Sequence, residues 1–299
     1  MPGRFGFGVV VFAAITTLAP LDANFLTIDN PHFPKIWDSY FRNKSSKFNI
    51  YIHPKYPENV TWKKNKIIDN LKETGWGFIV EAYYELLKAA YKNKNNIKFV
   101  TISESDVPIK DFDTFYNNCI TDKDSWIKFM KLKKYNLKER IGKQPSKNKP
   151  NNIIKHYARF CLNREHVKEL LNNYDKLHFF IKMQVGDEFF LSVLYPIVNV
   201  KNFAVTYDDW DYIHQLQKKI KDEKKKIYEN QEKTGSNRSS ISNNLKVLNN
   251  EYNKISKSPK TIVNVSDEDL DKIKQSKSYF YRKFDKKSNI EKYWKNIIQ

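Results

Sequence analysis

The chain has 299 residues, of which 40% are hydrophobic and 15% aromatic, and it contains 8 glycines and 2 cysteines. These apolar side chains suffice for a substantial core, which excludes a fibrous or low-complexity protein, and two cysteines exclude a disulfide framework. The formal net charge of +19 favours anionic partners, but no recognition-helix, zinc-finger or RNP-like motif accompanies it, so we expect no specific nucleic-acid partner.

Residues 1–20 form an apolar N-terminal segment whose core is Phe5–Ala19, preceded by Arg4. The run is long enough for a signal peptide and short for a spanning helix. Its VVVF stretch suits a buried strand equally well, because periodicity does not separate the two. Membrane association through this segment, a secretory location and a cytoplasmic location therefore all stay open.

From residue 21 to the C-terminus we expect one domain in which strands alternate with helices. Strands are predicted at residues 24–28, 48–54 and 97–102, and a helix begins near Pro34. Trp76–Ala90 has the three-and-four apolar spacing of a buried helical face. Such alternation predicts an α/β fold with a mostly parallel sheet flanked by helices.

Polar residues follow two of these strands, where parallel sheets bind their ligands. His53 lies at the end of one strand, and the SESD turn with Glu104 and Asp106 follows another. Glu104 and Asp106 have the spacing of a metal-binding DxD motif, and residues 209–211 spell one literally. A manganese site is therefore one interpretation, although acidic pairs are common in charged chains.

Two segments interrupt the predicted domain. Lys131–Asn152, rich in Lys, Asn and Pro, is predicted to be a loop. Residues 213–256 are highly charged and carry two helical patterns around a TGSNRSSISNN breaker, which predicts an inserted helical hairpin or a disordered segment. Cys119 and Cys161 match no zinc spacing, so we expect two half-buried thiols, as is usual in a reducing compartment.

Near the C-terminus, Ser266 is predicted to cap a helix, with Asp269 completing a capping box, and that helix should end near Ser276. Arg282 and Lys283 follow within the aromatic YFYRKF segment. Cations held on a rigid aromatic strand suit an anionic ligand.

Several motifs together resemble the core-2/I-branching family of glycosyltransferases, in the family's order. They are IYIHP, TGWGFIVEAYYELLKAA, FVTISESDVPI, KHYARFCLNREHV, GDEFFLSVL, VTYDDW and the closing SPKT and YFYRKF segments. The resemblance implies a GT-A-like fold and transfer from a UDP-sugar, with GlcNAc or xylose favoured, to a glycan or protein acceptor.

The resemblance also implies a metal-independent reaction. Lys260 and Lys283 match the basic positions that hold the donor diphosphate, which lets two ammonium groups supply the charge of a divalent ion. Glu188 matches the glutamate that serves as catalytic base and removes the acceptor proton in a single, inverting displacement. Asp187 and Glu188 would equally suit the first turn of a helix.

The remaining site residues are assigned more loosely. His53 and Asp106 are predicted to bind the nucleotide. An acceptor or sugar pocket is predicted from Trp76, Glu104, Lys155, Arg159, Asp187 and Trp210. Two alternatives stay open: a manganese-dependent DxD glycosyltransferase, and a basic binding or scaffold protein without catalysis.

Overall fold

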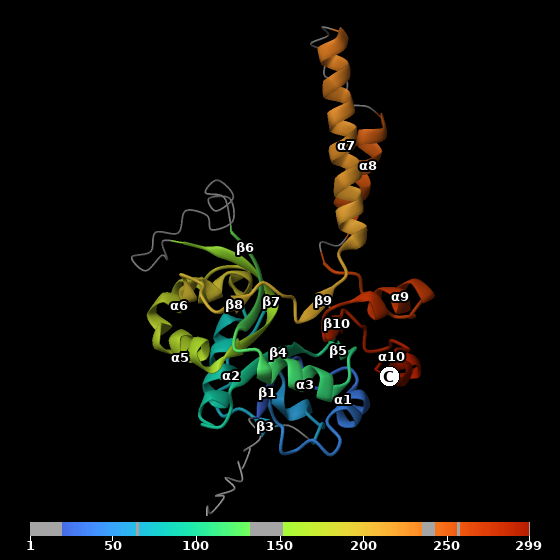
Figure 1. Ribbon diagram of the computed structural model, residues 1–299. Coiled ribbons are helices and arrows are strands. Elements are labelled where there is room, and N and C mark those ends of the chain that lie inside the picture. The colour runs from blue at the N-terminus through green and yellow to red at the C-terminus, as the bar shows by residue number, and fades with distance from the viewer. Residues whose placement is uncertain (1–19, 64–65, 132–151, 235–242, 256–257, 299) are drawn as a thin grey trace, which may run out of the picture.

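The computed structural model describes residues 20–63, 66–131, 152–234, 243–255 and 258–298 (Figure 1). The predicted N-terminal segment up to residue 19 and the predicted loop between Lys131 and Asn152 lie outside these ranges, as does the turn of the predicted hairpin. None of the described helices is both long and apolar enough to cross a membrane.

A seven-stranded sheet forms the centre of the domain, in the order β3-β2-β1-β4-β7-β6-β8. Its strands are β1 (Leu21–Thr27), β2 (Phe48–Pro54), β3 (Lys66–Ile67), β4 (Lys98–Ser103), β6 (Ser125–Lys131), β7 (Ile154–Asn163) and β8 (Val200–Lys201). β7 is antiparallel to both neighbours, and the other four pairings are parallel. The predicted mostly parallel α/β sheet is confirmed.

Helices cover both faces of the sheet. The longer ones are α1 (Pro34–Tyr40), α2 (Val80–Tyr91), α3 (Phe112–Thr121), α5 (Arg164–Asn172), α6 (Tyr174–Ile181), α7 (Asp211–Thr234), α8 (Asn243–Lys254), α9 (Asp267–Gln275) and α10 (Glu291–Ile297). Short 3₁₀ turns lie at η1 (Pro57–Asn59), η2 (Gly186–Glu188) and η3 (Phe190–Leu194).

Two apolar clusters, one on each face, follow from the alternation of side chains along the strands. On β4, Phe99 packs with α2, α5 and α6, whereas the next residue, Val100, packs with α1 and α3. Phe160 and Cys161 on β7 divide in the same way. Because both faces of the sheet are covered, the first five residues of β1 are all buried.

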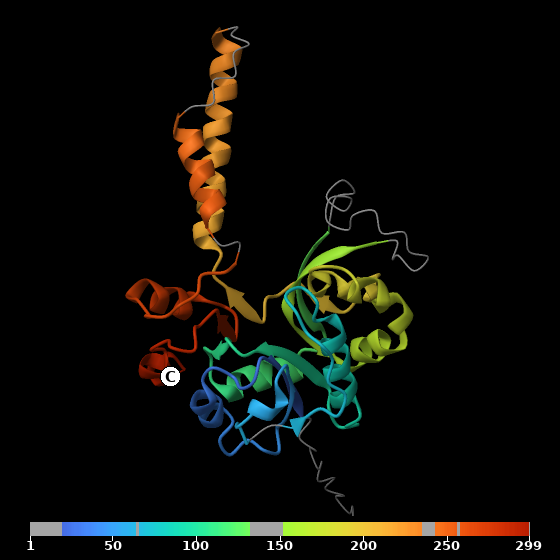
Figure 2. The same cartoon turned by 180° about the vertical axis from the view of Figure 1, so that it is seen from behind.

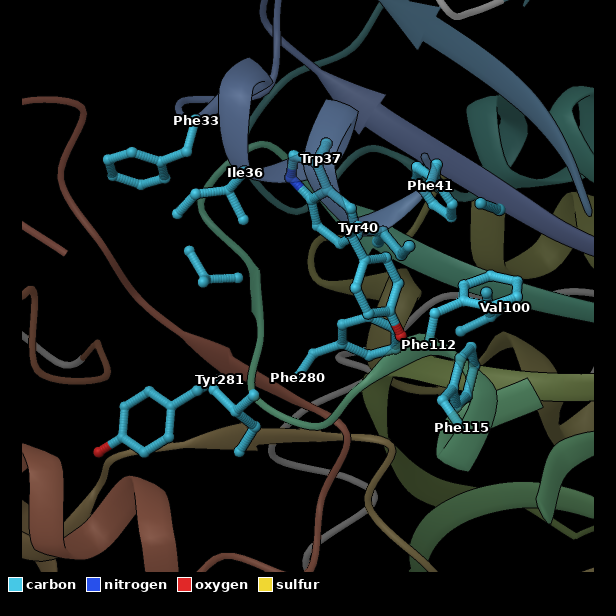
Figure 3. Packing of buried hydrophobic residues seen from close by; sticks show 14 of the residues in the cluster. Phe33, Ile36, Trp37, Tyr40, Phe41, Val100, Phe112, Phe115, Phe280 and Tyr281 are labelled. Atoms are coloured by element: carbon cyan, nitrogen blue, oxygen red, sulfur yellow. The ribbon is translucent and has the colours of Figure 1, made fainter. Parts of the chain in front are cut away.

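A second, three-stranded sheet has the order β5-β10-β9, with β5 (Val107–Pro108), β9 (Thr206–Asp208) and β10 (Phe280–Arg282). Its central strand is held by the aromatic cluster of Figure 3, in which the rings of Trp37 and Phe280 lie 5.9 Å apart. The cluster therefore fixes the C-terminal segment, including Arg282, against the main domain.

Helices α7 and α8 pack against each other and project from the rest of the molecule (Figures 1 and 2). Leu216, Ile220 and Leu245 form a small core between them, and the faces around this core are charged. The two helices form the charged helical hairpin expected in the inserted segment.

The start of α2 differs from the prediction. The apolar spacing predicted a helix from Trp76, but the helix begins at Val80, and Gly75 and Phe78 pair in a turn before it. Gly77 in this turn has a φ of +75°, and a Cβ there would lie 2.7 Å from the backbone nitrogen of Val185. Trp76 is consequently a surface residue, and the residue is 78% exposed.

Two local predictions concern the ends of elements and the cysteines. The capping box of Ser266 and Asp269 is present at the start of α9, and the helix ends before Ser276 as predicted. The prediction of half-buried thiols is wrong, because Cys119 and Cys161 are fully buried within the core.

Candidate active site

A cavity of about 380 Å³ lies at the carboxyl ends of β1, β2 and β4. The register pairs Leu26 on β1 with both His53 on β2 and Ser103 on β4, so the three strands end side by side, as expected for a parallel sheet. Residues of these ends form one wall, the turn around Trp76 forms the rim, and Arg159, Arg282 and Lys283 complete the lining.

The lining of this donor cavity, as we call it, is mainly cationic. Lys55, Arg159, Arg282 and Lys283 contribute four positive side chains, and Glu104 contributes a carboxylate. Glu104 accepts a hydrogen bond from the backbone N–H of Ile28 at 2.6 Å, which fixes its orientation. The cavity therefore suits an anionic ligand more than a neutral one.

Asp106 lies beneath the cavity rather than on its surface. It is fully buried and accepts hydrogen bonds at 2.8 Å from both the backbone N–H and the hydroxyl of Ser103. The guanidinium groups of Arg159 and Arg282 contact it at 3.3 and 3.6 Å. Asp106 thus holds the two arginines in place.

Asp208 on β9 adds a second carboxylate to this network, accepting a hydrogen bond from Arg282 at 2.7 Å. Burial raises the pKa of Asp208, although the charges of Arg282 and Arg159 oppose the shift. The sequence marked Arg282 as a cation suited to an anionic ligand but gave it no place in the site, and it did not mark Asp208. The signal that could have found them is the pairing of the YFYRKF strand with the VTYDD strand, which is a tertiary contact.

Glu188 and Asp187 lie in the single turn η2. The carboxylate of Glu188 is 2.9 Å from the ammonium of Lys155 on β7, and both side chains are partly exposed, at 33% and 25%. Asp187 points inward, and its Oδ1 is buried without a hydrogen-bond partner. Burial, followed by the charge of Glu188, raises the pKa of Asp187 from 3.8 to about 6.

Strand β7 connects the two groups of residues. Lys155, Tyr157 and Arg159 occupy every second position along it, although the pairing of β7 with β6 is irregular between His156 and Phe160. Lys155 binds Glu188 at one end of this row, and Arg159 lines the donor cavity at the other. Tyr157 lies between them, and its pKa is raised by burial and then by the charges of Asp208 and Glu188. Tyr157 was not among the residues selected from the sequence, although the two-residue spacing marks it.

His53 does not line the cavity. It is fully buried, and its Nε2 accepts a hydrogen bond from the backbone N–H of Lys72 at 2.8 Å. Burial lowers the pKa of His53 and favours its neutral form. The hydrogen bond of its Nε2 is thus with the protein backbone.

Lys260 and Trp210 line a different cavity, of about 660 Å³, at the base of the hairpin. The ammonium of Lys260 lies 2.6 Å from Asp269. Its segment nevertheless runs beside Lys283, since the N–H of Ile262 donates to the carbonyl of Lys283 at 2.8 Å. The backbone segments that carry Lys260 and Lys283 therefore run side by side, but the two lysine side chains line separate cavities.

The sequence matches the model of the Core-2/I-branching enzyme family over residues 24–234, more than two thirds of the chain. The chain belongs to this family. The match to the family includes every strand of the central sheet except the first residues of β1, together with Lys155, Arg159 and Glu188. Lys260 and Lys283 lie beyond it.

A curated relative that carries an activity in its name is similar over a shorter stretch. Glycosyltransferase BC10 of Oryza sativa subsp. japonica is 29% identical over 103 residues, which cover 31% of this chain and 26% of the relative. The match thus spans about a quarter of that protein's length.

In both acidic pairs with DxD spacing, aspartates form ion pairs with lysine or arginine side chains. Lys272 lies 3.1 Å from Asp209 and 3.2 Å from Asp211, and Asp106 is bound by two arginines. Within the described ranges, no three His, Cys, Asp or Glu side chains converge in a way suited to a metal ion.

Proposed function

We propose that this protein is an inverting glycosyltransferase that moves a sugar, GlcNAc or xylose, from a UDP-sugar to a hydroxyl of a glycan or protein acceptor. The proposal rests on strand β7. At one end of this strand Lys155 binds the carboxylate of Glu188, and further along it Arg159 lines the cationic donor cavity. Family membership supports the reaction class, and the name of the rice relative agrees with it.

In the proposal the donor cavity holds the nucleotide diphosphate. Its volume of about 380 Å³ is in the range of small-ligand pockets. Lys283, Arg282 and Arg159 provide positive charge from two different strands and the segment after β10. As the bond to the sugar breaks, negative charge grows on the departing UDP, and fixed cations stabilise it without reorganisation.

Glu188 is the proposed base. The acceptor oxygen attacks the anomeric carbon, UDP departs with the bonding electrons, and the acceptor proton passes to the carboxylate. The ammonium of Lys155, 2.9 Å from that carboxylate, fixes its direction. One displacement without an enzyme nucleophile inverts the configuration of the sugar.

Charge neutralisation by side chains makes the proposed reaction independent of a metal. Lys283 supplies one ammonium group directly to the donor cavity. A contact between Lys260 and the diphosphate would have to replace its present pairing with Asp269. The rival mechanism, with manganese on Glu104 and Asp106 or on Asp209 and Asp211, would have to displace arginine or lysine from those acids.

Incubation with a panel of UDP-sugars, with and without EDTA, tests this function. We expect hydrolysis or transfer from UDP-GlcNAc or UDP-xylose at equal rates in both conditions, and NMR of a transferred product should show an inverted anomeric centre. Strict dependence on manganese would support the rival mechanism instead. No turnover with any donor, together with no binding of UDP, would reject the catalytic assignment.

A further inference from the structure

Cys119 on α3 and Cys161 on β7 meet in the core. Their sulfur atoms lie 3.4 Å apart, and both side chains are fully buried. They are the only two cysteines of the chain and are 42 positions apart in the sequence. Neither lines the donor cavity or the cavity at the base of the hairpin.

The two elements hold the sulfurs in register. Cys161 is paired with Val100 on β4 and with Trp126 on β6, so it sits in the middle of the sheet. Cys119 faces it from α3, one turn after Phe115, which packs in the same cluster. A disulfide needs about 2.05 Å between the sulfurs, so the pair must close by about 1.4 Å, a movement that side-chain rotation can supply.

The surroundings make the two thiols unequal. Burial raises the pKa of the Cys119 thiol. Burial also disfavours the Cys161 thiolate, but the hydrogen bond with Cys119 and the charge of Lys98 outweigh it, and the pKa of Cys161 lies below its usual value. Lys98 is itself buried, and its ammonium donates to the carbonyl of Asp124 at 2.5 Å.

We propose that Cys119 and Cys161 form a modification site at which an intramolecular disulfide joins α3 to β7. The oxidant is a small disulfide of the glutathione class. The thiolate of one of the two cysteines attacks it, which forms a mixed disulfide and releases one small thiolate. The other cysteine loses its proton and attacks the sulfur of the first, which releases the second small thiolate. One small disulfide and two protein thiols yield one protein disulfide and two small thiols.

Because both sulfurs are buried, the exchange takes place while this part of the core is open, during folding or in local unfolding. The product closes a loop that contains β6 and most of β7. It therefore restricts the unfolded chain and stabilises the fold in an oxidising compartment, while the reduced pair packs as two small apolar side chains. The same core then serves in either redox environment.

A redox titration of the full chain in glutathione buffers tests the proposal, carried out once under folding conditions and once in guanidinium chloride. Alkylation and mass spectrometry give the oxidised fraction, which is about 2 Da lighter before alkylation. Because the fold holds the sulfurs together, we expect the folded protein to form the disulfide with an effective thiol concentration roughly 30- to 1000-fold above that of the denatured chain. An equal or lower value for the folded protein would overturn the proposal, because the core would then resist the bond.

A thermal melt provides the second measurement. The oxidised protein should melt several degrees above the reduced protein, on the order of 5 °C. Cys119→Ala and Cys161→Ala are the matched controls, because each leaves a single thiol, and their melting temperatures should be the same in both buffers. A redox-dependent shift that persists in both variants would show that the stabilisation has another origin.

Discussion

Replacing Asp187 with asparagine should remove a pH dependence from the stability of the fold. Asp187 is largely buried beside Glu188, and its pKa is raised from 3.8 to about 6. The folded protein therefore binds a proton that the unfolded chain has already lost. This proton stabilises the fold fully below the unfolded value of 3.8, and its contribution is lost as the pH rises through about 6.

The size of the effect follows from these two pKa values. Between pH 4 and pH 7 the wild-type free energy of unfolding should fall by about 2 kcal/mol through Asp187, most of it below pH 6. Asp187→Asn does not titrate and lacks this loss. The amide adds its own cost or gain at a site where Oδ1 lacks a partner, but that contribution is the same at every pH.

Urea denaturation of both proteins at pH 4, 5, 6, 7 and 8 measures the difference in the free energy of unfolding. We expect the variant to gain about 2 kcal/mol on the wild type between pH 4 and pH 7, then no more. Glu188→Gln should reduce the pH dependence only in part, because burial is the larger cause of the shift and the Glu188 charge is the second. A difference that stays constant from pH 4 to pH 8 would refute the reasoning.

Two further predictions concern the donor cavity and the hairpin. Lys283→Ala should weaken UDP binding, measured by calorimetry, by roughly ten- to hundred-fold, because this is the affinity that a charge-assisted contact contributes. Lys260→Ala is the matched control and should have a smaller effect, since the ammonium of Lys260 is paired with Asp269. The reverse order would exchange the roles of the two lysines. Replacing Gln215–Ile255 with a short Gly/Ser linker should leave one cooperative unfolding transition, since the hairpin has its own small core and projects from the domain; loss of cooperativity would show that the hairpin belongs to the main core.

Individual strands could be anticipated from the local sequence where apolar runs end in polar turns. Residues 48–54 and 97–102 each carry such a run, and the structure brings their ends to one edge of the sheet. Parallel strands with helices on both faces are almost entirely buried. They therefore appear in the sequence as short, nearly continuous apolar runs, which are easy to recognise. The capping box of Ser266 and Asp269 was equally visible, because all its contacts are local.

Features that depend on distant contacts were not accessible in this way. The apolar spacing around Trp76 suited a helix, but the close approach of Gly77 to Val185 requires a turn instead. Lys260 was grouped with Lys283 because both match basic positions of the resembled family, whereas its ammonium is bound by Asp269 of the following helix. Periodicity indicates which residues share a face of a helix or strand. It does not indicate which charged side chains already form an ion pair.

Part of the candidate site could be predicted from the sequence. Glu188 and Lys155, both selected from the sequence, lie in contact. Asp106 was selected for the nucleotide but lies below the cavity and holds the two arginines. Arg282 and Asp208 lie opposite each other on β10 and β9 of the second sheet, 74 positions apart in the sequence, and no local pattern marks such a pair.

The proposed role of Glu188 is to remove the proton of the acceptor. Its most direct test is the rate of sugar transfer in a single turnover by Glu188→Gln, with UDP binding measured on the same sample and Glu165→Gln, an exposed position on α5, as the matched control. We expect transfer by Glu188→Gln to fall by about two to four orders of magnitude while UDP binding and the control remain at wild-type values. Transfer near the wild-type rate in Glu188→Gln would show that Glu188 is not the base.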